Sequence, residues 1–250
     1  ISIATKLNLR GPVNLHFLLA NDQIYLLQIK SYSGHNVAFL TKALKKDITA
    51  ITMKVLLGST LSELDLPSDI WPSNDLIHVK MPVFSYLSYS SENTFDSKMK
   101  TSGSVMGRAK HLPTALFKGY EGSDLMISTY GTVFISVKDS EKHNAIKIAA
   151  RFHQLGFKLL ATEGTANVLA EEGITTGIIE KVQEGSNSLL EKIKQHRINL
   201  VINVTSLSDS ASHDAIMIKD AALSTHIPVF SSLQSAQDVL IVLETLAMTT

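Results

Sequence analysis

The stretch FKLLATEGTANVLAEEG, residues 157–173, contains the junction that decides how the second half of the chain folds. Residues 157–161 form an apolar run with the length and composition of a buried β-strand. A helical pattern of apolar residues starts almost at once after it. Thr162, Gly164 and Thr165 lie at the junction. The stretch therefore predicts a strand joined to a helix by a very short connection that carries two hydroxyl groups and a glycine.

Strand-like and helix-like segments alternate on both sides of this junction. Apolar strands separated by helices are typical of a parallel sheet that helices cover on both faces. The pattern therefore predicts an α/β domain with right-handed crossovers. Besides the quoted stretch, we expect strands at residues 131–137, 178–182, 198–203 and 227–231, and helices at residues 141–155, 189–195, 214–224 and 236–246.

The first half has a different organisation. Residues 13–19 and 24–30 have the composition of two strands, and Asn21–Asp22 between them predicts a hairpin turn. Residues 39–58 have helical spacing, with Gly58 as a C-terminal stop. This part is expected to be an α+β segment.

A stretch of different composition separates the two halves. Residues 87–107 are rich in Ser, Thr, Gly and Asn, which is typical of a loop or linker. We therefore expect the domain boundary after it, near residues 108–130. Because the chain begins with Ile1 and not with Met, we also expect it to be the later part of a longer protein.

The composition excludes several classes of function. The chain has 250 residues and is 44% hydrophobic, so it can bury a large core. Lys+Arg and Asp+Glu are both 23, which gives no overall attraction to nucleic acid. There is no cysteine, hence no disulfide, thiolate metal site or cysteine nucleophile. No apolar run reaches the length of a membrane span. We expect a cytoplasmic protein without a nucleic-acid or membrane partner.

Polar side chains lie at four junctions of the expected sheet. The carboxyl ends of parallel strands share one edge, where ligands bind and where helix N-termini attract phosphate. Hydroxyl, amide and ammonium groups, with a glycine that permits close approach, suit such an anion. The alternative is that Thr165 only caps its helix and Gly164 only turns the chain. The junction residues are Ser136, Lys142, Thr162, Thr165, Lys181, Asn203 and Thr205.

Other chemical motifs are absent. The nine histidines are scattered without HxH or HExxH spacing, so no metal site is predicted. GxSxG, P-loop and GxGxxG patterns are also absent, so the sequence gives no indication of a hydrolase, a P-loop nucleotide site or a dinucleotide site.

Several motifs together resemble one known family. GTVFISVKDSEK, GFKLLATEGTANVLAEEGI, KVQEG and INLVIN resemble the C-terminal regulatory domain of the carbamoyl-phosphate synthetase large chain, a domain of the methylglyoxal synthase-like type. Upstream, GPVNLHFLL, KMPVFS and MKTSGSVMG resemble the end of the second ATP-grasp domain of the same large chain. The resemblance covers essentially the whole chain, in the same order.

The resemblance implies a domain division and a function. Residues 1–107 would be the C-terminal part of an ATP-grasp domain, residues 108–129 a linker, and residues 130–250 an allosteric domain with a Rossmann-like five-stranded parallel sheet. The seven junction residues match family positions that bind a nucleotide monophosphate or a similar effector. Their agreement with the junction argument favours an effector site.

The parent enzyme of this family is an ATP-dependent ligase. It makes carbamoyl phosphate from bicarbonate, glutamine-derived ammonia and two ATP, with Mg²⁺, for pyrimidine and arginine biosynthesis. The implied partners are a small glutamine amidotransferase chain, the remainder of the large chain and a nucleotide effector, and a homo-oligomer is compatible with this scheme. The piece itself is expected to be non-catalytic and to hold no cofactor.

The chain departs from the family at the ATP-grasp metal positions. The family's metal-binding Gln, Glu and Asn correspond to His16, Gln28 and Lys30 here, and two family Arg positions are Tyr32 and His35. Mg²⁺ requires oxygen ligands, and an ammonium group repels it. We therefore expect a degenerate domain that does not hold Mg-ATP.

The chain also departs from the family at positions that bind effectors. Where the family often has arginines, this chain has His213, Lys219 and Asp220, while Asp214 is kept. Met81 replaces the acidic residue that binds an amine effector in some members, so regulation by an ornithine-like amine is not expected.

Three alternatives remain open. Methylglyoxal synthase would need a carboxylate base in the loop of residues 183–188, which contains Glu184 but no Asp. The IMP cyclohydrolase half of the bifunctional purine enzyme shares the strand–Thr–Gly–Thr junction, but its Lys-Thr-Leu-His-Pro signature is absent. The third alternative is a binding or interaction module that has lost its effector.

Overall fold

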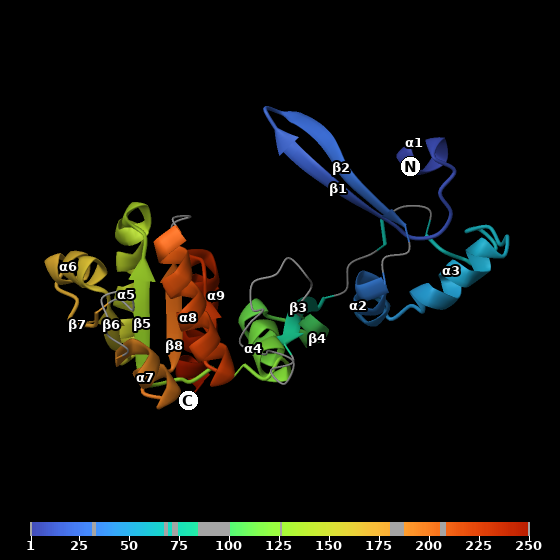
Figure 1. Ribbon diagram of the computed structural model, residues 1–250. Coiled ribbons are helices and arrows are strands. Elements are labelled where there is room, and N and C mark those ends of the chain that lie inside the picture. The colour runs from blue at the N-terminus through green and yellow to red at the C-terminus, as the bar shows by residue number, and fades with distance from the viewer. Residues whose placement is uncertain are drawn as a thin grey trace. The chain divides into compact units, whose positions relative to one another are not determined.

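The computed structural model describes residues 2–31, 34–67, 70–71, 75–84, 101–125, 127–180, 188–205 and 209–249. The chain forms two compact units, Ile1–Asp75 and Leu76–Thr250 (Figure 1). This division by compactness does not test the boundaries expected from the family at residues 107 and 130, which stay predictions.

In its described residues, the first unit contains one hairpin and three helices. Strands β1 (Val13–Ala20) and β2 (Gln23–Ser31) pair antiparallel, as predicted. The turn residues Asn21 and Asp22 both have positive φ, 51° and 56°, which is the backbone of a tight hairpin turn. The helices are α1 (Ser2–Lys6), α2 (Gly34–Leu44) and α3 (Ile48–Leu56).

The single helix expected over residues 39–58 is wrong, because two helices occupy this region. Lys45 has φ 53° and cannot continue α2. Asp47 then starts α3, and its side chain accepts a hydrogen bond of 2.9 Å from the Ala50 N–H. A polar cap residue within the apolar pattern therefore divides the helix.

The first unit leaves much apolar surface uncovered. Among its described residues only Ala43 is buried, whereas Leu19 and Ile24 near the hairpin tip are each 71% exposed. Apolar surface of this extent is uncommon on a stable monomer. The described residues of this unit therefore do not form a hydrophobic core of their own.

The second unit begins with a small subdomain. Strands β3 (Ile77–Phe84) and β4 (Thr101–Ala109) pair antiparallel, and α4 (Leu112–Gly122) packs on them. A Cβ atom on Gly107 would overlap the backbone of Ala115, and one on Gly119 would lie 2.7 Å from Cγ of Met81. The two glycines therefore allow the helix to approach the hairpin closely. Part of the expected linker, residues 108–129, is thus a packed helix.

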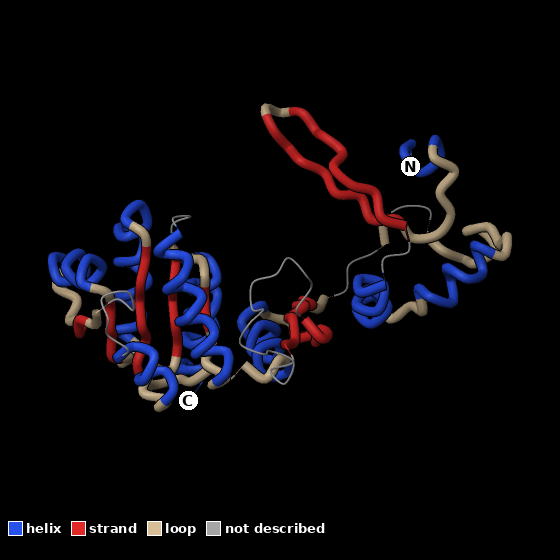
Figure 2. Tube along the Cα trace, in the orientation of Figure 1, coloured by secondary structure: helices blue, strands red, loops and turns tan. Residues whose placement is uncertain are grey.

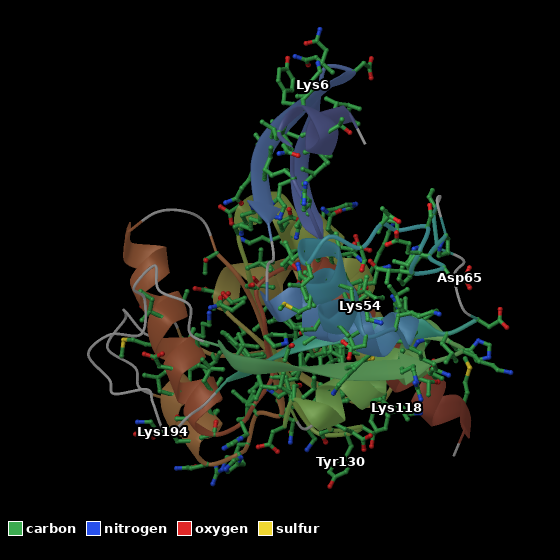
Figure 3. The ribbon with its side chains drawn as sticks, turned by 90° about the vertical axis from the view of Figure 1, so that its right-hand side faces the viewer. Lys6, Lys54, Asp65, Lys118, Tyr130 and Lys194 are labelled. Carbon is green, nitrogen blue, oxygen red and sulfur yellow. The ribbon has the colours of Figure 1, made fainter. Side chains whose placement is uncertain are left out.

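Tyr120 joins α4 to the large sheet. Its ring meets that of Phe230 edge to face, with centroids 6.4 Å apart. Burial, and to a lesser degree the Asp238 carboxylate, raises the pKa of Tyr120 to about 12. On the following connection Tyr130 is 76% exposed and points away from the unit (Figure 3).

The five-stranded parallel sheet is confirmed. Its strands are β5 (Thr132–Val137), β6 (Lys158–Ala161), β7 (Gly177–Ile178), β8 (Leu200–Val204) and β9 (Val229–Phe230). They are arranged in the order β7-β6-β5-β8-β9, with every neighbouring pair parallel. β5, which comes first in the chain among these five strands, therefore occupies the centre of the sheet (Figure 2).

Helices cover both faces of this sheet. Val133 and Ile135 of β5 belong to a core formed with α5 (Lys142–Gln154), α6 (Glu163–Glu171) and α9 (Leu233–Thr249). Phe134 faces the other way, into a core formed with α7 (Ser188–Lys194) and α8 (Asp209–Ser224). A short 3₁₀ turn, η2 (Asp139–Glu141), precedes α5. These two cores confirm the predicted α/β architecture.

The close approach of β4 and α4 gives a stability prediction. Gly107→Ala would place a methyl group against the Ala115 backbone and should lower the free energy of unfolding by about 1–3 kcal/mol. Gly103→Ala in the same strand is the matched control, because its methyl group would meet no atom within 4 Å. Urea unfolding of both variants tests this, and equal stabilities would contradict the packing of α4 on β4.

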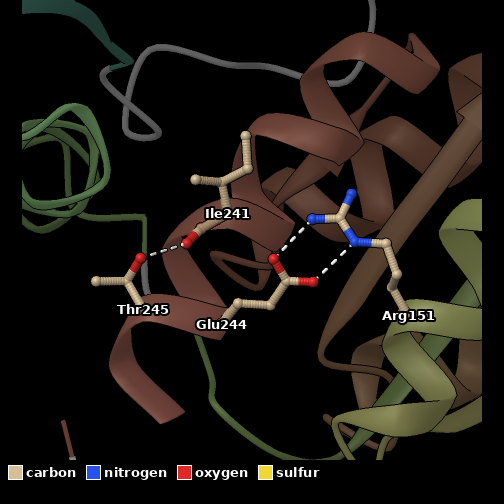
Figure 4. A network of polar contacts seen from close by, with 4 residues as sticks. All are labelled: Arg151, Ile241, Glu244 and Thr245. Carbon is tan, nitrogen blue, oxygen red and sulfur yellow. Dashed lines mark hydrogen bonds and ion pairs between the residues drawn. The ribbon is translucent and has the colours of Figure 1, made fainter. Parts of the chain in front are cut away.

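A bidentate ion pair between α5 and α9 gives a pH prediction (Figure 4). Arg151 Nε and Nη2 donate to the two Glu244 carboxylate oxygens, each at 2.7 Å. The Arg151 hydrogen bonds hold the pKa of Glu244 below its ordinary value of 4.5. The pair therefore stabilises the fold fully above that value, and the contribution is lost as the pH falls through the lowered pKa.

We expect Glu244→Gln to lower the free energy of unfolding by about 1 kcal/mol at neutral pH. The difference from wild type should disappear in acid. Glu171→Gln, at the exposed end of α6, is the control. A Glu244→Gln deficit that persists unchanged in acid would show that the charge of the pair does not matter.

Candidate functional site

Three adjacent strand ends present polar side chains at one edge of the sheet. Register places Ser136 of β5 beside Asn203 of β8, and Ile135 beside Ala161, the last residue of β6. Thr162 follows Ala161 directly and is therefore the neighbour of Ser136 on the other side. From β5 the chain continues to β6 and β7 on one side and later to β8 and β9 on the other. This is the switch point at which open α/β sheets bind ligands.

Thr162 and Thr165 form a buried pair of hydroxyl groups. Their exposed fractions are 6% and 1%, and Thr162 Oγ1 donates to Thr165 Oγ1 at 3.3 Å. Thr162 is the N-cap residue of α6, but its side chain makes no capping hydrogen bond. The N–H groups of Thr165 and Ala166 both donate to the Thr162 carbonyl oxygen at 2.8 Å, whereas those of Glu163 and Gly164, the first two residues of α6, have neither an intrahelical acceptor nor a side-chain cap. Thr165 is the third residue of α6 and not its N-cap residue, so the alternative in which Thr165 only caps the helix does not describe this junction.

Lys142 supplies a positive charge at the same place. A Cβ atom on Gly164 would lie 2.8 Å from Lys142 Nζ, so the ammonium group lies directly over the first turn of α6. Nζ is also 2.7 Å from Oδ1 of Asp139. An ammonium group, two hydroxyls and free helix N–H groups together form a surface suited to a phosphate.

The remaining predicted residues have different outcomes. Asn203 is 7% exposed, Ser136 is half-buried, and Thr205 beyond the strand is exposed. Lys181 and Glu184 lie outside the described residues, as does the rest of the loop in which a methylglyoxal synthase base was considered. Six of the seven predicted residues are therefore at or next to this edge of the sheet.

Asp139 was not among the site residues predicted from the sequence. An acidic residue three positions before a lysine, at the start of a helix, is the pattern of an ion pair and could have indicated it. A second acidic group, Asp214 on α8, has the one buried side-chain oxygen without a hydrogen-bond partner within the described residues. Asp214 was noted only as a residue kept from the family.

The altered metal positions lie together on the β1–β2 hairpin. His16 is opposite Gln28, and Asn14 is opposite Lys30. Residues directly opposite each other share a face of the sheet, and these two strands contain no carboxylate. The described segments contain no group of three or more histidines and acidic residues that could hold a metal ion. Loss of Mg-ATP binding stays a prediction.

The described residues of the first unit also contain a cavity. This cavity of about 360 Å³ lies between the start of β1 and α2, lined by Pro12, Val13, Asn14, Leu15, Asn36, Val37, Phe39 and Leu40. Its walls are mostly apolar, unlike the strand-end site.

Within the described ranges of the chain, no helix is long and apolar enough to cross a membrane.

The fold and this edge define an α/β module of the type that binds ligands at strand ends. Comparison with protein families gives the type of module: a family model described as the MGS-like domain matches residues 144–231. The match includes Thr162, Thr165, Asn203 and Thr205, whereas Ser136 and Lys142 precede it. The parallel sheet agrees with this type of domain.

One solved structure described as "Crystal structure of ForH" is similar to the chain. It shares 22% sequence identity, with 46% of this chain and 80% of that chain covered, at a TM-score of 0.38. This likeness is too distant to carry an argument about function.

The threonine pair gives a prediction about stability. Thr162→Val or Thr165→Val alone would leave the other buried hydroxyl without its partner, at a cost of about 1–3 kcal/mol. The double variant replaces both hydroxyls by methyl groups of similar shape and should be nearly as stable as wild type. Urea unfolding, with hydrogen exchange of β6 and α6 to localise the effect, tests this. If the two single effects simply add, the hydroxyls are not partners.

Proposed function

We propose that the last domain binds a phosphate-bearing small-molecule effector of the nucleotide monophosphate type. The observation that carries this proposal is the Lys142 ammonium group over the first turn of α6, beside the buried hydroxyls of Thr162 and Thr165. An uncapped helix start with an adjacent ammonium group favours an anion, and the buried hydroxyls can donate to it.

The other polar residues at this edge of the sheet would bind the nucleoside part of the effector. A phosphate at α6 lies at one end of the row formed by Thr162, Ser136 and Asn203. Hydroxyl and amide groups along this row can hydrogen-bond a sugar or a base. Thr205, together with Lys181 from outside the described residues, would complete the site.

We further propose that the chain is the C-terminal part of a carbamoyl-phosphate synthetase large-chain-like protein. The MGS-like match supports the last domain of that assignment. The upstream motifs and the opposition of His16 to Gln28 fit a degenerate ATP-grasp hairpin. In this proposal the parent enzyme would use ATP and Mg²⁺ and bind an amidotransferase chain, while this piece regulates and does not catalyse.

Titration of the 250-residue chain with uridine and inosine monophosphates at fixed ionic strength tests effector binding. The variant Thr162→Val/Thr165→Val removes two charge-assisted hydrogen bonds, each worth roughly 1.5–3 kcal/mol. Its affinity should therefore fall by about two orders of magnitude or more. Because this double variant should retain its stability, the loss would report on binding.

Two results would contradict the proposal. Equal affinity of wild type and double variant would place the phosphate elsewhere. Absence of binding by wild type at millimolar nucleotide would favour a module that has lost its effector.

The variant Gly164→Ala tests the position of the Lys142 ammonium group in a second way. Its methyl group would displace this ammonium group, although the substitution raises helix propensity.

A further inference from the structure

Lys142 has two neighbours that compete for its positive charge. Its Nζ pairs with Asp139 Oδ1 at 2.7 Å and also lies over Gly164 at the start of α6. The lysine side chain is 22% exposed, whereas the aspartate side chain is 94% exposed. The ammonium group is therefore held by its surroundings near the helix start, while the carboxylate projects into solvent.

We propose that Asp139 is an internal competitor for the phosphate of the effector, an inference that rests on the proposed function of this site. A phosphate at the first turn of α6 must share the Lys142 ammonium with the Asp139 carboxylate or displace it. Two anions on one ammonium group repel each other. Because Asp139 is the more exposed partner, it is the group that moves aside.

This role makes Asp139 an affinity-determining residue. In the absence of a competing anion, the Asp139 carboxylate neutralises a lysine that would otherwise attract any anion to the helix start. An anion that contacts only Lys142 therefore does not displace the Asp139 carboxylate. A phosphate displaces it, because the phosphate also accepts hydrogen bonds from Thr162, Thr165 and the α6 N–H groups.

The charge-neutral variant Asp139→Asn tests the inference. It should bind uridine monophosphate about fivefold more tightly at low salt, which corresponds to about 1 kcal/mol, the interaction of two unit charges about 4 Å apart in water. The gain should shrink at high ionic strength because the carboxylate is exposed. Binding of uridine, which has no phosphate, should not change.

Glu141→Gln is the matched control. It removes the same charge from the same 3₁₀ turn, but the Glu141 carboxylate accepts from Asn144 Nδ2 at 3.0 Å and is not the partner of Lys142. Its affinity for uridine monophosphate should stay close to wild type. Thermal unfolding of both variants detects a merely structural role of Asp139, which would lower stability without tightening binding.

The outcomes separate this inference from the proposed function. If wild type binds and Thr162→Val/Thr165→Val does not, but Asp139→Asn binds as wild type does, the competitor role is wrong and the effector site stands. An equal gain in Glu141→Gln would also overturn it, as a general charge effect. Binding by Asp139→Asn when wild type fails to bind would support the competitor role, and failure of both would refute both proposals.

Discussion

The parallel pairing of β5 with β6 on one side and β8 on the other is the interaction on which the second unit depends. β5 is buried on both faces, because Phe134 packs towards α7 and α8 while Val133 and Ile135 pack towards α5, α6 and α9. Since all three strands run in one direction, their carboxyl ends lie at one edge and the following helices begin there. The ligand edge is therefore a consequence of the topology and not of a single motif.

The glycine and the two threonines of the ATEGTA junction have distinct physical roles. Gly164 has no side chain, and this permits the Lys142 ammonium to lie over the first turn of α6. Thr162 and Thr165 bond to each other and leave the helix start uncapped. A junction designed only to start a helix would use a threonine hydroxyl as the cap. The observed arrangement instead keeps hydrogen-bond donors available at a positively charged position.

Much of the second unit could be predicted from the sequence, because apolar runs and short polar junctions repeat there with a regular period. The central strands and the helices after them lie close to their expected positions. Strand β4 and the packing of α4 were missed, since residues 87–107 were expected to be a loop or linker and residues 108–129 a linker. Gly107 and Gly119 instead permit close helix–strand contact. The Arg151–Glu244 pair was also not predictable, because it joins residues 93 positions apart.

The placement of the predicted site residues in the fold could be derived only in part from the sequence. Residues at the ends of neighbouring strands follow from parallel topology, so the grouping of Thr162, Ser136 and Asn203 could be derived. The position of a long side chain such as Lys142 over the first turn of α6 depends on packing and could not be derived, whereas its i, i+3 spacing from Asp139 could have indicated their ion pair. In the first unit, spacing alone did not reveal that Lys45 ends a helix, since its positive φ is set by the turn.

A crystal structure of the chain with uridine or inosine monophosphate tests the central claim most directly. The account predicts a phosphate group at the first turn of α6, with oxygens within about 2.7–3.2 Å of the Thr162 and Thr165 hydroxyls and of the Gly164 N–H. It also predicts that Lys142 contacts the phosphate and that the nucleoside extends along the edge towards Ser136 and Asn203. A nucleotide phosphate bound away from α6, with the two threonine hydroxyls still paired to each other, would contradict it.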